Sequence, residues 1–134
     1  MTVHVLIPVF NRLEMTRSII DQLRSQVLDE ALAITVVDDG STDGSDEFLR
    51  EQPDVSTLKG DGNLWWGGAI DLGLRYVLPM AAEKDWVLFV NNDTEIRPDF
   101  VQRLLDSARR HAPAAVGCVV RDIAPPHQVL SVGP

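Results

Sequence analysis

The sequence predicts an α/β fold with three layers, α/β/α, around a mostly parallel β-sheet. Short apolar runs typical of strands alternate with segments of helical periodicity, which favours parallel strands joined by helices. The run from Trp86 to Val90 is apolar at every position, as expected for a central strand buried on both faces. At 134 residues the chain can bury a real core, so we expect a single domain over residues 1–134.

The first half of the chain predicts three strands and two helices. The strands are expected over residues 3–8, 32–37 and 54–58, the last of them near a sheet edge. Asn11 and Glu14 form a variant of the capping box at the start of the first helix. The apolar stripe of that helix comprises Thr16, Ile19, Ile20, Leu23 and Val27. A short helix is expected over residues 43–50.

The second half predicts two longer helices on either side of the apolar strand at residues 86–90. The first covers residues 66–78, with an inner face of Ala69, Ile70, Gly73, Leu74, Val77 and Leu78. Pro98 suits the first position of the second helix. Its apolar lining is Phe100, Val101, Leu104, Leu105 and Ala108. A strand over residues 115–120 would bury Cys118 as a small hydrophobe, and residues 128–132 are a candidate further strand.

Charge and composition argue against several kinds of partner. The formal net charge is −8 and the twelve basic residues are scattered, which disfavours nucleic acid or an anionic membrane surface as the main partner. The single Cys118 excludes an intramolecular disulfide, and the chain enters its first strand without a secretory signal. No apolar run approaches the roughly 20 residues that span a bilayer. We therefore expect a cytoplasmic protein, with a peripheral position at the inner membrane face as the alternative.

Polar residues follow three of the expected strands. They are Pro8 to Arg12, Asp38–Asp39 and Asn91 to Glu95. In a parallel sheet these strand ends lie on one rim, where open α/β sheets bind their ligands. Because successive strand residues point to opposite faces, Asp38 and Asp39 should diverge, one tied into the following loop and one facing the crevice.

Two interpretations of this acidic rim remain open from the residues alone. Asp93 with Asp38 or Asp39 offers hard oxygen ligands that suit Mg²⁺ or Mn²⁺, and such an ion would bridge the rim to a diphosphate. Asp39 is also suited to accept hydrogen bonds from a base or a ribose. Alternatively, these carboxylates only cap the turns that follow the strands.

The segment from Gly60 to Gly68 combines four glycines with the pair Trp65–Trp66. Glycine allows close backbone approach to a ligand, and indole faces can line a base or sugar pocket. The alternative is that both tryptophans belong to the core. The segment is not a dinucleotide fingerprint, because Trp65 stands where a third glycine is required.

At these residues the chain resembles the family 2 glycosyltransferases, which have the nucleotide-sugar-binding GT-A fold. The resemblance spans about residues 3 to 121 and consists of four motifs in the family's order. They are Ile7–Arg12, Val37–Ser45 with Asp-Asp-Gly-Ser-x-Asp, Gly62–Ala69, and Asn91–Asp93 at the place of the metal-binding Asp-x-Asp. The Gly-Asn-Leu-Trp-Trp-Gly-Gly run looks most like the rhamnosyltransferase-type branch.

The resemblance implies a role for each motif residue. Pro8, Phe10 and Asp39 would contact the nucleotide base and nearby ribose, while Asn91 would help at the ribose or phosphate. Asp93 would ligate the metal, Mg²⁺ or Mn²⁺. The remaining candidates for donor binding are Asn11, Asp38, Asn63, Trp65, Trp66 and Asn92.

The implied activity is metal-dependent transfer of a sugar from a UDP- or dTDP-sugar to a saccharide or lipid-linked acceptor hydroxyl, with inversion. Two positions depart from the family pattern: Asn91 replaces the first Asp of Asp-x-Asp, and Asp71 stands where Asn is common. Family catalytic domains are longer, and their acceptor site and general base lie in a part corresponding to sequence after residue 134. The resemblance therefore implies only the N-terminal, donor-binding part of a GT-A domain, and we assign no catalytic base.

Two rival functions were weighed. A phosphoacceptor receiver domain also carries paired aspartates at a strand end. In receivers the pair follows the first strand and a lysine lies near the end of the fifth strand. Here the pair follows the second strand, and the last lysine, Lys84, precedes the strand expected at residues 86–90. A non-catalytic nucleotide-sugar-binding module stays open as the alternative. Apolar residues expected to lie uncovered also suggest a homo-oligomer; they are Val119, Val129, Leu130 and Val132.

Overall fold

The computed structural model describes residues 1–132, and the chain groups into two compact units. The first unit comprises residues 1–21 and 30–94, and the second comprises residues 22–29 and those from 95 onward. Within residues 1–132, no helix is both long enough and apolar enough to cross a bilayer.

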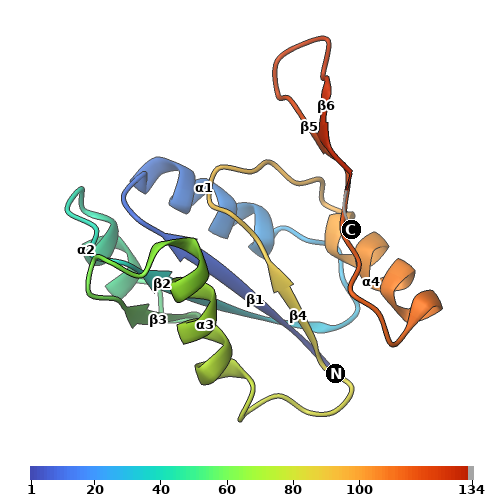
Figure 1. The fold of residues 1–134 in the computed structure, drawn as a ribbon, viewed down its shortest axis with the longest axis horizontal. Helices are drawn as coiled ribbons and strands as arrows, with labels where there is room; N and C mark the ends of the chain where they lie inside the picture. Colours follow the sequence, from blue (N-terminus) through green and yellow to red (C-terminus); the bar gives the residue numbers. More distant parts are fainter. Residues whose placement is uncertain (133–134) are drawn as a thin grey trace. The chain divides into compact units, whose positions relative to one another are not determined.

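The first unit is built on a four-stranded, fully parallel sheet (Figure 1). In sheet order its strands are β3 (Val55–Lys59), β2 (Ala31–Asp38), β1 (Thr2–Val9) and β4 (Trp86–Phe89). This confirms the predicted α/β class and the edge position of the third strand. The prediction of a central fourth strand was wrong for the described residues, because β4 pairs only with β1 and Phe89 is 45% exposed. An apolar run indicates that both faces of a strand are apolar, but it does not indicate that the strand has a neighbouring strand on each side.

Both faces of this sheet are covered. Successive residues of β1 point to opposite faces, yet Val5, Leu6 and Ile7 are all buried. Helix α3 (Trp65–Val77) packs on the face that carries Leu6, where a Cβ on Gly73 would lie 3.0 Å from Leu6 Cδ2 and 3.4 Å from Val37 Cγ2. The inner face of α3 matches the prediction at Ala69, Ile70, Gly73 and Val77, whereas Leu78 lies beyond the helix and is exposed.

The first helix begins by a different device from the one predicted. Helix α1 (Leu13–Arg24) buries Thr16, Ile19, Ile20 and Leu23 as expected, but Val27 lies past its end and is exposed. Asn11 is not its cap, because the Asn11 carboxamide oxygen accepts the Thr42 N–H instead. The Leu13 N–H donates to the carboxylate of Asp43, from the loop before α2 (Ser45–Arg50). A cap supplied from 30 residues away leaves no local pattern.

The second unit contains α4 (Phe100–His111), whose buried side chains are Val101, Leu105 and Ala108. Pro98 precedes the helix instead of opening it, because its carbonyl accepts the Val27 N–H at 2.8 Å and Asp99 takes the N-cap position. Gln26 ties the two chain segments of this unit together. Its Nε2 donates to the Arg97 carbonyl at 2.8 Å, and its Oε1 accepts the Val101 N–H at 3.0 Å.

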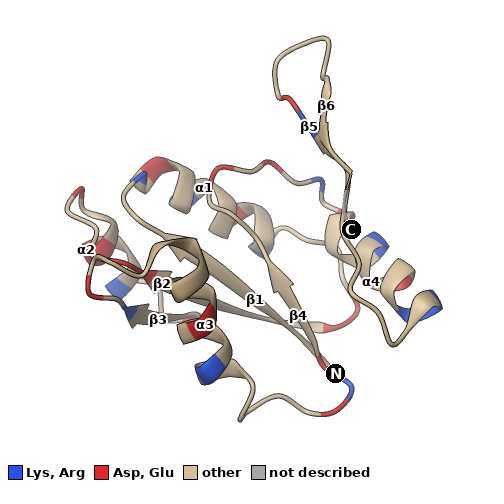
Figure 2. Ribbon diagram, in the orientation of Figure 1, with Lys and Arg blue, Asp and Glu red and all other residues tan. Residues whose placement is uncertain are grey.

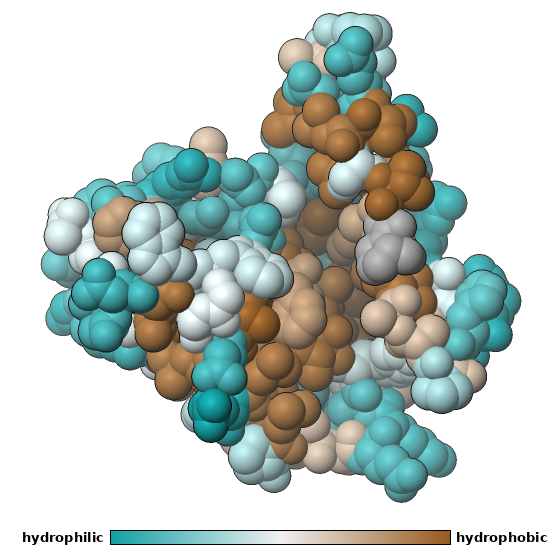
Figure 3. Space-filling view, viewed as in Figure 1, coloured by the Kyte–Doolittle hydropathy of each residue, from teal (hydrophilic) through white to brown (hydrophobic). Residues whose placement is uncertain are grey.

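Beyond α4 the second unit has one antiparallel pair, β5 (Val120–Arg121) with β6 (Val129–Ser131). Of the strand predicted over residues 115–120, only its last residue is in a strand, and Cys118 is exposed instead of buried. Apolar composition predicts burial only where a sheet receives the segment, and this pair contacts only itself as a sheet. Apolar side chains on the hairpin stay at the surface (Figure 3).

Candidate functional site

The strand ends of the first unit border an open cleft of about 270 Å³. Its walls are Pro8, Val9, Phe10, Arg12, Asp39, Trp65, Trp66, Ala69, Asn91, Asn92 and Asp93. The cleft therefore brings together all the predicted site residues except Asn11, Asp38 and Asn63. Acidic residues lie on the loops after both β2 and β4 (Figure 2).

Asp38 and Asp39 diverge as the strand geometry predicts. Asp38 is buried, and its Oδ1 accepts the Ser41 N–H at 3.0 Å within its own loop. Asp39 is 6% exposed and belongs to the cleft wall. Its Oδ1 accepts the Gly62 N–H at 2.8 Å, and its Oδ2 accepts the N–H groups of Leu64 and Trp65 at 3.0 and 3.1 Å. Asp39 thus fixes the loop that leads into α3.

Glycine makes the close approach of that loop feasible. A Cβ on Gly60 would overlap both the Asp39 carboxylate and the Leu64 side chain. The Gly60 N–H donates to the Asp38 carbonyl at 2.8 Å, so the loop lies directly against the end of β2. Three backbone donors at the start of α3 also offset the charge of the buried Asp39 carboxylate.

The loop after β1 is held by the loop after β2. The Asn11 N–H donates to Ser41 Oγ at 2.7 Å, and Asn11 Oδ1 accepts the Thr42 N–H at 2.8 Å. Asn11 and Arg12 have φ angles of 56° and 62°, a backbone region that residues other than glycine rarely adopt. Asn11 therefore supports the loop that borders the cleft without lining it. Phe10, which is 60% exposed, lines the cleft.

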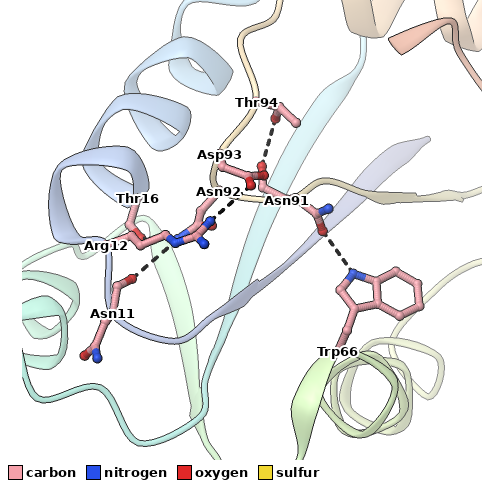
Figure 4. A network of polar contacts seen from close by, with 8 residues as sticks. All are labelled: Asn11, Arg12, Thr16, Trp66, Asn91, Asn92, Asp93 and Thr94. Atoms are coloured by element: carbon pink, nitrogen blue, oxygen red, sulfur yellow. Dashed lines mark hydrogen bonds and ion pairs between the residues drawn. The ribbon is translucent and has the colours of Figure 1, made fainter. Parts of the chain in front are cut away.

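The loop after β4 is held by polar contacts to three other parts of the chain (Figure 4). The buried Asn92 donates from Nδ2 to Thr16 Oγ1 at 3.1 Å on α1. Asn91 Oδ1 accepts the indole N–H of Trp66 at 2.9 Å, which joins this loop to the start of α3. Asp93 Oδ2 accepts from Arg12 Nη1 at 3.1 Å, so Arg12 contributes the cation facing this carboxylate.

The tryptophan pair lies at the surface, so the alternative that both tryptophans belong to the core was wrong. Trp65 is 81% exposed and Trp66 is 55% exposed, and both line the cleft. Trp65 has a φ of 56°, so its backbone is strained, as at Asn11 and Arg12. Strain at three cleft-forming positions is a pattern that functional sites share. Asn63 lies outside the cleft wall, and its N–H donates to Asp61 Oδ1 at 2.8 Å.

The described cleft wall offers one available carboxylate to a divalent ion, so the protein alone would hold such an ion weakly and a phosphate ligand would strengthen its binding. Among residues 1–132, no three His, Cys, Asp or Glu side chains gather as a metal cluster. Asp38 is engaged in its loop, and the Asp39 oxygens accept three backbone N–H groups. Asp93 remains as the available carboxylate, with a side chain 45% exposed. One carboxylate completed by substrate phosphates is a common Mg²⁺ arrangement, so Asp93 fits this role.

Sequence reasoning missed three lining residues: Val9, Arg12 and Ala69. Arg12 is the one of chemical interest, since it is the single basic side chain among the described residues of the cleft wall. The sequence contained a signal for its role in the cleft, because Arg12 belongs to the polar run after the first strand. Its pairing with Asp93, 81 residues away, has no counterpart in the local sequence.

Comparison with known proteins agrees with this architecture. The N-acetylglucosaminyl-diphospho-decaprenol L-rhamnosyltransferase of Mycobacterium tuberculosis (strains CDC 1551 / Oshkosh and ATCC 25618 / H37Rv) is 30% identical over 106 residues, covering 73% of this chain and 34% of the relative. The "Putative glycosyltransferase EpsH" of Bacillus subtilis (strain 168) is 27% identical over 109 residues, covering 79% of this chain and 30% of the relative. The chain thus spans about a third of the length of these curated relatives. The profile of the family described as Glycosyl transferase family 2 matches residues 4–128, and the chain belongs to that family.

Proposed function

We propose that the cleft binds the nucleoside diphosphate of a nucleotide-sugar and is the donor site of a glycosyltransferase. The observation that carries this proposal is the convergence of three parallel strand ends on one cleft with a buried carboxylate and exposed aromatic walls. Membership in glycosyl transferase family 2 supports the same reading. The donor-binding part corresponds mainly to the first unit of the chain.

Asp39 is the proposed partner of the base or ribose. A carboxylate offers about four lone-pair sites, and the backbone occupies three of them. One site on Oδ1 remains for an N–H or O–H of the nucleoside. Pro8 and Phe10 would contact the flat face of the base from the loop after β1. Asp38, Asn11 and Asn63 act indirectly, by shaping the loops that carry these contacts.

The sugar diphosphate would extend toward the loop after β4. Trp65 and Trp66 offer apolar indole faces to the sugar, and Asn91 and Asn92 hold the loop at the ribose and phosphates. Asp93 would hold Mg²⁺ or Mn²⁺ together with the diphosphate oxygens. Such an ion, when bound, neutralises the charge that develops on the leaving diphosphate.

In the proposed reaction the acceptor oxygen bonds to the anomeric carbon as the bond to the diphosphate breaks, with inversion. The acceptor proton passes to a general base, which we do not assign among the described residues. We propose a UDP- or dTDP-sugar donor and a saccharide or lipid-linked acceptor. Similarity to the mycobacterial L-rhamnosyltransferase supports a deoxysugar such as rhamnose. A nucleotide-sugar-binding module without its own transferase activity is the second candidate, and donor binding without sugar transfer would support it.

Calorimetric titration with UDP and dTDP, with and without EDTA, tests the donor site. We expect binding that EDTA weakens, and Asp93→Asn should remove most of this metal dependence because it removes the available carboxylate. Asp71→Asn is the matched control, since Asp71 is an exposed carboxylate on α3 outside the cleft wall. Absence of binding at millimolar nucleotide would refute the site, and binding that ignores chelation would refute the metal role.

A further inference from the structure

Arg12 places a positive charge in the cleft wall, next to the carboxylate of Asp93. Its Nη1 lies 3.1 Å from Asp93 Oδ2, the carboxylate that we propose for the metal. The other charged side chains of the described cleft wall are Asp39 and Asp93 themselves. The guanidinium therefore neutralises Asp93 in the protein without ligand (Figure 4).

Both partners of this ion pair are placed by fixed backbone. Arg12 has a φ of 62° and is bracketed by two anchored neighbours: the Asn11 N–H donates to Ser41 Oγ, and the Leu13 N–H donates to Asp43 Oδ2. On the opposite side, Asn92 holds the segment before Asp93 through its bond to Thr16. The proximity of Arg12 and Asp93 thus follows from the loops, not from the ion pair.

The ion pair itself is easily opened. The Arg12 and Asp93 side chains are 58% and 45% exposed, and ion pairs at such exposure contribute little to stability. A guanidinium also matches two phosphate oxygens at once, which makes a diphosphate a strong competitor for it. An anion entering the cleft would therefore attract Arg12, and a divalent cation would attract Asp93.

We propose that Arg12 is an exchangeable counter-ion of the donor site. It neutralises Asp93 when the cleft holds no ligand, leaves Asp93 when a divalent cation binds there, and donates to the diphosphate of the incoming nucleotide. This inference rests on the proposed function for the diphosphate, but the competition at Asp93 rests on the ion pair alone. Arg12 is a binding and positioning residue, and no proton or bond is transferred to it.

Two titrations of Arg12→Gln test the exchange. With Mn²⁺ alone, the variant should bind up to about fivefold more tightly than the unmodified chain, because a competing cation is gone. With UDP or dTDP in EDTA, it should bind about tenfold more weakly, because a charged donor to the diphosphate is gone. Opposite signs in the two titrations are the signature of an exchangeable cation.

Matched variants separate this effect from a change in charge or fold. Arg75→Gln removes an exposed arginine that pairs with Asp71 on α3, outside the cleft wall, and should change neither titration. Arg12→Lys keeps the cation and should keep Mn²⁺ affinity close to that of the unmodified chain. Adding Asp93→Asn to Arg12→Gln should abolish the gain in Mn²⁺ affinity. Circular dichroism melts verify that each variant is folded.

Each outcome bears on a defined part of the proposal. Unchanged or weaker Mn²⁺ binding by folded Arg12→Gln overturns the competition at Asp93. Unchanged nucleotide binding in EDTA overturns the contact to the diphosphate. If the unmodified chain binds no nucleotide at all, the donor site and the diphosphate contact fail together, whereas tighter Mn²⁺ binding by Arg12→Gln still supports the exchange of cations at Asp93.

Discussion

Asp39 joins structural support with the proposed ligand recognition in one side chain. Its three backbone contacts reach residues 23 to 26 positions away, so it fixes the start of α3 from the end of β2. It also forms part of the cleft wall. The two interpretations left open by the sequence, a loop anchor and a nucleoside partner, are therefore compatible at this residue.

Asp39→Ala should lower the free energy of unfolding by about 1–3 kcal/mol, because partly buried N–H groups lose their acceptor. Nucleotide affinity should fall as well, including in EDTA, since the contact to the nucleoside does not involve the metal. Urea denaturation measures the first effect and calorimetry measures the second. Asp61→Ala in the same loop is the control, because Asp61 is exposed and accepts only the Asn63 N–H among the described contacts. Lost stability with intact affinity would leave Asp39 as a loop anchor only.

At the scale of elements, the packing of α3 on the sheet positions one side of the cleft. Gly73 allows this approach, because the helix backbone lies against the fully buried Leu6. Gly67 belongs to the same helix, but a Cβ there would meet no atom within 4 Å. Substituting each glycine in turn therefore separates the effect of packing from the effect of helix propensity within one helix.

Gly73→Ala should destabilise the protein by about 1–2 kcal/mol. Overpacking against Leu6 and Val37 typically costs about 1–3 kcal/mol, which exceeds the gain of about 1 kcal/mol in helix propensity. Gly67→Ala should instead stabilise the protein by up to about 1 kcal/mol, since only the propensity changes. Thermal and urea denaturation of both variants provide the comparison. Equal effects of the two substitutions would show that α3 is not closely packed at Gly73.

The elements that sequence predicted well are those whose pattern is local. The 3.6-residue periodicity predicted the buried face of α1 from Thr16 to Leu23. The alternation of side chains along a strand predicted that Asp38 and Asp39 point in different directions. Failures came where the deciding contact is distant in the chain. The cap of α1 comes from Asp43, and the partner of Arg12 comes from the loop after β4. The segment around Cys118 has strand-like composition but no sheet to join among the described residues.

At the scale of the whole molecule, one partly buried contact should shape acid stability. Backbone N–H groups of Ala82 and Thr2 and the His4 side chain hydrogen-bond the carboxylate of Asp85 and lower its pKa from 3.8 to about 2. Because the folded-state pKa is the lower one, Asp85 contributes stability above pH 3.8 and loses that contribution as the pH falls toward 2. The contact ties the start of β1 to the turn before β4.

Asp85→Asn should lower stability at neutral pH and flatten the loss of stability between pH 4 and pH 2. Urea unfolding across that range measures both effects. Some acid sensitivity should persist in the variant, because the Arg50 and Lys59 partners of Asp46 also lower the pKa of that carboxyl to about 2. Asp71→Asn, on the exposed face of α3, is the control. A variant with the same acid profile as the unmodified chain would contradict the assignment to Asp85.

The expected self-association stays a prediction that sedimentation at micromolar concentration can measure. The exposed apolar residues that motivate it lie on and beside the hairpin of β5 and β6; they are Val119, Val129, Leu130 and Val132. Single exposed hydrophobes are common, and several together favour association. Replacing Leu130 with Lys should shift any oligomer toward the monomer.

The loops that shape the cleft are joined by hydrogen bonds between residues 23 to 81 positions apart in the chain. Because contacts between residues distant in the chain carry a larger loop-closure cost, we expect the cleft to assemble late in folding. A nucleotide that binds only the folded chain would raise its melting temperature, and the rise would continue with the logarithm of the nucleotide concentration above Kd. A ligand-dependent rise in melting temperature would therefore also report whether the strands that border the cleft have paired.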